Sequence, residues 1–151
     1  QPVGTCVYIV ENKMVFSYLM EQVQGKNVSL LCTSGQPRYA ALKLISLIVQ
    51  SGIPIYYSGD LDPDGIGIAD RLWQRFGNRI QFFGMSPEDY RNSLSKEVFG
   101  ENGRKKLEHI WHPLLRETAE LVRKPGKAGY QENVLKELSE KLVGCDQNQN
   151  L

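Results

Sequence analysis

Four apolar runs, separated by segments whose apolar residues have helical spacing, constrain the fold of this chain more than any other feature. They cover residues 6–10, 28–32, 53–57 and 80–83. A strand that is apolar at consecutive positions is buried on both faces, as in a parallel sheet covered by helices. Parallel strands also need crossover connections, which the intervening helical segments supply. The order therefore predicts an α/β fold, with a Rossmann-like parallel four-stranded sheet flanked by helices.

The rest of the chain carries mostly helical signals. A Ser-Pro pair at 86–87 is typical of a helix start. We expect a long helix over 107–122 with Trp111 turned inward, a turn over 124–129 and a last amphipathic helix over 131–142. These signals predict a helical addition behind the sheet.

The length of 151 residues indicates one domain. We divide it into a core over residues 1–90, a helical extension of the same domain over 91–144 and a disordered tail over 145–151. The chain opens at Gln1, without an initiator Met, only a few residues before the first apolar run. We therefore expect it to be part of a longer protein with a further N-terminal region.

Composition narrows the function classes only slightly. A net charge of +1 neither demands nor excludes nucleic acid as a partner. Of the three cysteines, Cys6 and Cys32 lie in apolar runs, which favours a reduced, cytoplasmic protein. No apolar stretch reaches the roughly 20 residues that span a bilayer, so we expect no membrane partner. Oligomeric state stays open, a homo-oligomer included.

Acidic residues gather where two of the predicted strands end. Asp60, Asp62 and Asp64 follow the third apolar run, and Glu11 follows the first. In a parallel sheet ligands bind beyond the carboxyl ends of the strands, so these residues share a crevice if the two strands are neighbours. Carboxylates that lie together favour a hard cation such as Mg²⁺, Mn²⁺ or Ca²⁺. The pattern indicates metal-dependent chemistry.

Three other interpretations compete for this segment. Asp62 could simply cap a helix that begins at Pro63, which would leave Asp60 without a role. An EF-hand loop matches the opening letters but has Arg71 where its last ligand should be Glu, and a strand precedes it. A phosphoacceptor receiver module would use an acidic pair after the first strand, where this chain has Glu11 followed by Asn.

The motifs resemble those of the Toprim domain. They are Val-Glu-Asn at 10–12, Gly-Asp-Leu-Asp-Pro-Asp-Gly at 59–65 and the Ile-Gly-Ile-Ala that follows. This form is most similar to the Toprim domain of topoisomerase VI A subunits, to uncharacterised bacterial C-terminal Toprim-like domains and to Toprim nuclease subunits of anti-plasmid defence systems. Thr-Ser-Gly-Gln-Pro at 33–37 is similar to the bacterial proteins. The resemblance covers about residues 6–85, with a weaker match at 129–132.

The resemblance implies a site for Mg²⁺ or Mn²⁺ made by Glu11, Asp60 and Asp62, with Asp64 as a further ligand. It implies cleavage of DNA phosphodiester bonds, in which Glu11 could instead act as a general acid or base. Topoisomerase VI-like enzymes attack DNA with a Tyr on a separate domain, which this chain lacks. Either metal-activated water cuts the strand, which we expect, or a missing domain supplies the Tyr.

A phosphate-binding segment is predicted between the second apolar run and the next helix. Backbone N–H groups at a helix start suit a phosphate, as do a nearby hydroxyl and guanidinium. The residues are Ser34, Gly35, Gln36 and Arg38. An ordinary helix cap is the alternative. His109 and His112, three residues apart in the expected helix, are a weak zinc signal, for which we favour surface or packing roles. Glu132 could approach the acidic crevice, but we favour a plain carboxylate at a helix start.

Overall fold

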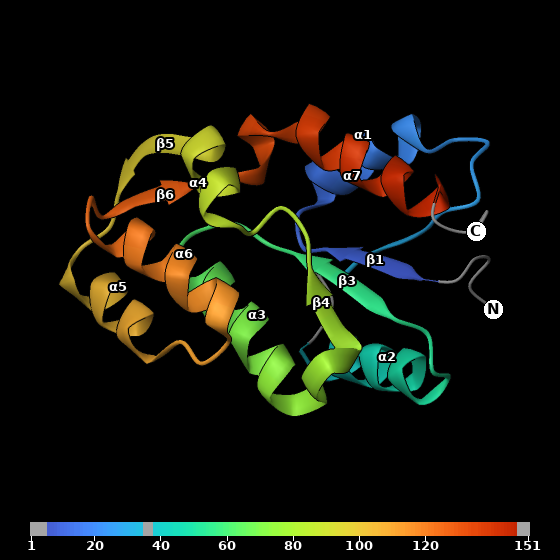
Figure 1. The fold of residues 1–151 in the computed structure, drawn as a ribbon, viewed down its shortest axis with the longest axis horizontal. Helices are drawn as coiled ribbons and strands as arrows, with labels where there is room; N and C mark the ends of the chain where they lie inside the picture. The colour runs from blue at the N-terminus through green and yellow to red at the C-terminus, as the bar shows by residue number, and fades with distance from the viewer. Residues whose placement is uncertain (1–5, 35–37, 148–151) are drawn as a thin grey trace.

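The computed structural model of the chain describes residues 6–34 and 38–147 (Figure 1). Four strands form a parallel sheet in the order β2-β1-β3-β4. The strands are β1 Val7–Val10, β2 Ser29–Cys32, β3 Ile55–Ser58 and β4 Ile80–Phe82. The predicted α/β class is confirmed, and β1 and β3 are neighbours, as the shared crevice requires.

Helices cover both faces of this sheet. Along β1, Val7 and Ile9 face one core while Tyr8 and Val10 face the other, because side chains alternate along a strand. The first core contains residues of α2 (Arg38–Gln50), α3 (Pro63–Phe76) and α6 (Pro113–Arg123), and the second contains residues of α1 (Lys13–Gln22) and α7 (Leu135–Gln147). Figure 1 shows α1 and α7 together above the sheet and α2 and α3 below it.

A second, two-stranded sheet stands beside the first. The chain after β4 forms α4 (Pro87–Ser93), β5 (Leu94–Val98), α5 (Glu101–Lys106), α6 and β6 (Lys127–Gly129). Strands β5 and β6 pair antiparallel. This sheet was not predicted: β5 reads Leu-Ser-Lys-Glu-Val and is largely exposed, so no buried face marks it, and β6 lies in the expected turn.

The prediction of one long helix over residues 107–122 is wrong. Leu107–His109 is a 3-10 turn, and α6 begins only at Pro113 because the residue before a proline avoids helical geometry. The buried Asp70 carboxylate fixes the break by accepting hydrogen bonds from the backbone N–H groups of Trp111 and His112.

This break moves two side chains away from their predicted places. Trp111 is 63% exposed rather than inward. His112 caps α6 and packs edge-on against the rings of Trp73 and Phe82, so it shares no helix with His109. The packing role that we favoured for His112 is confirmed.

The C-terminal boundaries also differ from those expected. Gln131–Asn133 is a 3-10 turn, and α7 runs from Leu135 to Gln147. Residues 145–147 therefore belong to α7, while 148–151 lie outside the described residues. Across the described ranges, no helix combines the length and the apolar character that crossing a membrane requires.

Candidate metal and phosphate site

The register of β1 and β3 fixes the position of Glu11. Val10 is opposite Ser58, so Glu11 comes beside Gly59 on the face that α2 and α3 cover. A Cβ at Gly59 would lie 3.3 Å from Oε2 of Glu11, which is tighter than an ordinary contact. The missing side chain therefore makes room for the Glu11 carboxylate above the end of β3.

Asp60 is held by the C-terminal part of the chain. Its Oδ1 accepts a hydrogen bond of 2.9 Å from the backbone N–H of Gln131. The next residue, Leu61, exchanges two backbone hydrogen bonds with Gly129, of 2.7 and 2.9 Å. The Gln131 side chain also donates to the buried Ser58 hydroxyl. These hydrogen bonds fix the end of β3, which carries the acids, against the segment 129–131.

Asp62 caps α3, as the structural interpretation of the motif expected. Its Oδ1 accepts a hydrogen bond of 2.7 Å from the Gly65 N–H, and Pro63 occupies the first turn. A Cβ at Gly65 would overlap the Asp60 carbonyl oxygen, so only glycine lets the loop fold this closely onto the helix. A carboxylate has two oxygens, so capping leaves Asp62 able to bind a ligand as well.

The Asp64 side chain pairs with a lysine of α5. Its Oδ1 forms an ion pair of 2.8 Å with Lys106 of α5, and its side chain is 76% exposed. Asp64 is thus more exposed than the three half-buried carboxylates, which we call the acidic cluster: Glu11, Asp60 and Asp62. Asp62 lines a depression with Asp64 and Lys106, and this depression differs from the one that Glu11 and Asp60 line.

Electrostatics within the acidic cluster are unfavourable. Burial raises the pKa of Glu11 against the nearby Tyr57 hydroxyl and the Arg71 charge, and the negative charges of Asp60 and Asp62 add to the rise. Burial also raises the pKa of Asp60, helped by the charges of Asp62 and Glu132 and opposed by the Gln131 N–H. The pKa of Asp62 is raised by burial and by the Asp64 charge, against the Gly65 N–H. Each ionised member therefore costs free energy that a cation would offset.

The donor set fits a hard divalent cation, although the side chains are not gathered around one point. Among the described residues, no three His, Cys, Asp or Glu side chains lie close enough to hold a metal ion. Glu11 and Asp60 do line one depression of about 480 Å³ at the sheet edge. Carboxylate oxygens are the ligands that Mg²⁺ and Mn²⁺ prefer.

Three residues near the acidic cluster were either not predicted or given lesser roles from the sequence. Gln131 was not singled out, and only the weak motif at 129–132 pointed to it. Asn12 caps α1 through Oδ1 and donates a hydrogen bond of 3.2 Å to Glu132. Glu132 therefore approaches the acidic crevice, close enough for its charge to act on Asp60.

The predicted phosphate-binding residues fall on two sides of Glu11. Ser34 lines the depression that Glu11 and Asp60 share. Arg38, at the first position of α2, lines a separate pocket that also contains Glu11. Gly35 and Gln36 lie outside the described residues.

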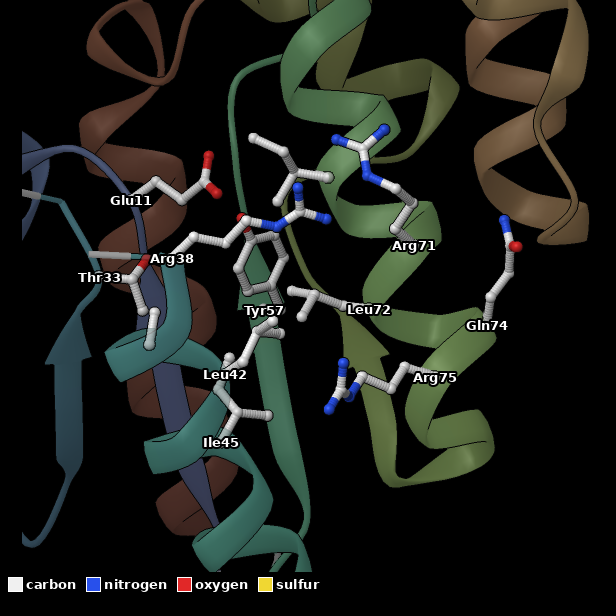
Figure 2. A pocket seen from close by; sticks show the side chains of 12 residues that line it. Glu11, Thr33, Arg38, Leu42, Ile45, Tyr57, Arg71, Leu72, Gln74 and Arg75 are labelled. Carbon is white, nitrogen blue, oxygen red and sulfur yellow. The ribbon is translucent and has the colours of Figure 1, made fainter. Parts of the chain in front are cut away.

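That separate pocket, of about 650 Å³, opens between α2 and α3 (Figure 2). Arg38 projects into it from α2, and Arg71 and Arg75 project from α3. Tyr57 of β3 and Glu11 also line it. We call it the arginine pocket.

Comparison with known proteins places the chain in a family. The model of the DUF2399 family, described as "Protein of unknown function C-terminus", matches residues 1–142. The chain belongs to the DUF2399 family. The match extends well past residue 85, so β6 and Gln131, which form hydrogen bonds with the acidic loop, belong to the DUF2399 domain as much as the parallel sheet does.

A curated relative of this DUF2399 domain is the Wadjet protein JetD of Bacillus cereus (strain Q1). The two are 25% identical over 124 residues, which cover 74% of this chain and 30% of the relative. The chain therefore spans about a third of the length of that relative.

Proposed function

We propose that this DUF2399 domain is the metal-binding catalytic part of a larger nuclease that hydrolyses phosphodiester bonds in DNA. One observation carries the proposal: Glu11 and Asp60 extend from adjacent strand ends beside the cap residue Asp62, half-buried and with raised pKa values. Like charges held together in this way favour a divalent cation.

Each residue of the acidic cluster has a distinct part in the proposal. Asp60 and Asp62 would hold Mg²⁺ or Mn²⁺ from the β3–α3 loop, which Gln131 and Gly65 orient through backbone N–H groups. Glu11 would complete the ligand set or move a proton at the attacked phosphate. When bound, such an ion stabilises charge on phosphoryl oxygens and activates water.

Water, rather than a tyrosine of the sheet, is the proposed nucleophile. Tyr8 and Tyr57 are 3% and 1% exposed and pack in the two cores, so neither side chain is exposed as a nucleophile for a DNA strand. The choice of DNA rests on the Toprim resemblance and agrees with the similarity to a Wadjet protein. The family description as a C-terminus supports an N-terminal region as partner.

The test is cleavage of supercoiled DNA by the full-length protein with Mg²⁺ or Mn²⁺. Asp60→Ala/Asp62→Ala should abolish cleavage, and Glu137→Ala/Glu140→Ala, which removes two exposed charges from α7, should leave it unchanged. Cleavage that survives in the first variant contradicts the proposal. If denaturant traps a covalent protein–DNA adduct, a tyrosine and not water attacks the DNA, and the hydrolytic proposal is wrong.

A further inference from the structure

The arginine pocket is lined by three arginines and one acid, so its net charge is positive. Arg38, Arg71 and Arg75 line it, and within the described ranges none of them forms an ion pair with an acid. Glu11 is the one acid among the lining residues that the structure describes. Guanidinium groups bind phosphate oxygens through paired, charge-assisted hydrogen bonds, so the rim suits a phosphate.

A buried hydroxyl on the wall of the arginine pocket points to the same kind of ligand. Tyr57 is 1% exposed, and its hydroxyl makes no hydrogen bond with any residue that the structure describes. The Glu11 carboxylate points toward this hydroxyl without reaching hydrogen-bonding geometry (Figure 2). A buried hydroxyl without a partner costs free energy that a bound ligand would recover.

The walls of the arginine pocket indicate a ligand that is larger than an inorganic anion and partly apolar. Most of the lining between the arginines is apolar, from Leu42 and Ile45 of α2 to Ile68 and Leu72 of α3. A volume of about 650 Å³ lies in the usual range for organic ligands and far exceeds a phosphate. A nucleotide presents both an apolar base and a phosphate.

We propose that the arginine pocket binds one nucleotide unit, with its phosphate between Arg71, Arg75 and Arg38 and its base against the apolar wall. Tyr57 would donate its hydroxyl proton to an oxygen of the ligand. The proposal rests on the proposed function only for the source of this nucleotide, which would be a unit of the DNA strand next to the acidic cluster. A free nucleotide presents the same chemistry.

The experiment measures equilibrium binding of 2′-deoxyadenosine 5′-monophosphate and of a short single-stranded oligonucleotide to the whole chain, in EDTA. Replacing Arg71→Gln/Arg75→Gln should weaken binding at least about tenfold, because two charge-assisted contacts are lost. Tyr57→Phe should weaken it about threefold to tenfold. Arg91→Gln, which removes an exposed arginine of α4, should change nothing.

The outcomes separate this proposal from the nuclease. Asp60→Asn should leave binding in EDTA intact, so a failed cleavage test with intact nucleotide binding contradicts the nuclease alone. Binding of the oligonucleotide but not of the mononucleotide assigns the pocket to a DNA strand, and equal binding assigns it to free nucleotides. No binding of either ligand, or equal binding by the Arg71→Gln/Arg75→Gln variant, overturns the proposal, as does a phosphate ion that binds as tightly as the nucleotide.

Discussion

The acidic cluster and the arginine pocket share Glu11 but favour ligands of opposite charge. The cluster holds carboxylates whose pKa values burial raises, and the pocket holds exposed arginines that form no ion pair among the described residues. A cation offsets the first and an anion offsets the second. Glu11 lines both depressions, so under the two proposals this one residue would couple metal binding to recognition of a phosphate.

The largest expected effect comes from the shared residue. Glu11→Gln should reduce cleavage by the full-length protein more than about a hundredfold, because even residues outside the ligand shell cost about 10–100-fold when changed. Glu132→Gln is the matched control: this exposed carboxylate is also near Asp60, but its hydrogen bond goes to Asn12. We expect less than about a fivefold loss there. Equal losses in both variants would contradict a role in cleavage that is specific to Glu11.

Two glycines of α3 test how closely the loop that carries Asp60 packs onto the start of this helix. Gly65→Ala should lower the free energy of unfolding by about 1–3 kcal/mol and the metal affinity at least about tenfold, since the new methyl overlaps the Asp60 carbonyl. Gly67→Ala meets only the flexible Arg71 guanidinium at 3.2 Å and should stabilise the helix by up to about 1 kcal/mol. Denaturant unfolding and metal titration of both variants check this pair. Equal behaviour would contradict the close loop–helix contact.

The pH dependence of stability tests the charge balance in the acidic cluster. Because the folded pKa of Asp60 is raised, its contribution to stability is present below the ordinary value of 3.8 and is lost as pH rises through the folded pKa. Without metal, Asp60→Asn should therefore raise the free energy of unfolding near neutral pH, and the gain should vanish toward about pH 4. Denaturant unfolding at several pH values measures it.

Saturating Mg²⁺ should reverse this order, because it stabilises the native wild-type cluster and not the variant. Loss of stability in Asp60→Asn near neutral pH without metal would show that the Asp60 carboxylate is already well compensated, and would contradict a cluster that needs a cation.

The smallest effect is expected at Asp64. Its carboxylate is exposed and paired with Lys106, and exposed pairs contribute little. Asp64→Ala should change metal affinity by less than about threefold in a calorimetric titration. A larger loss would mean that Asp64 leaves Lys106 to join the ligand set, as the Toprim resemblance implies.

The sequence predicted the parallel sheet and α3 because their signals are local. Buried runs such as Val7–Val10 are apolar throughout, and Pro63 after Asp62 marks a helix start. Strand β5 has no such signal, and its partner β6 lies beyond two helices, so only tertiary contacts define it. The break before α6 likewise depends on the distant Asp70.

The same division holds for the candidate site. Glu11 and Asp60 follow apolar runs, so the rule for strand ends brought them together. Gln131 is 71 residues from the carboxylate it orients, and no sequence spacing reveals that contact. Arg71 and Arg75 are ordinary exposed residues of a helix until the packing of α3 beside α2 places them around Tyr57.

The most direct test of the central claim is calorimetric titration of the chain with Mg²⁺ and Mn²⁺, with and without a short DNA duplex. We predict binding by the wild type, at least with DNA present, and none by Asp60→Ala/Asp62→Ala. Unchanged binding by that variant, or no binding by the wild type under either condition, would contradict a metal site at the acidic cluster.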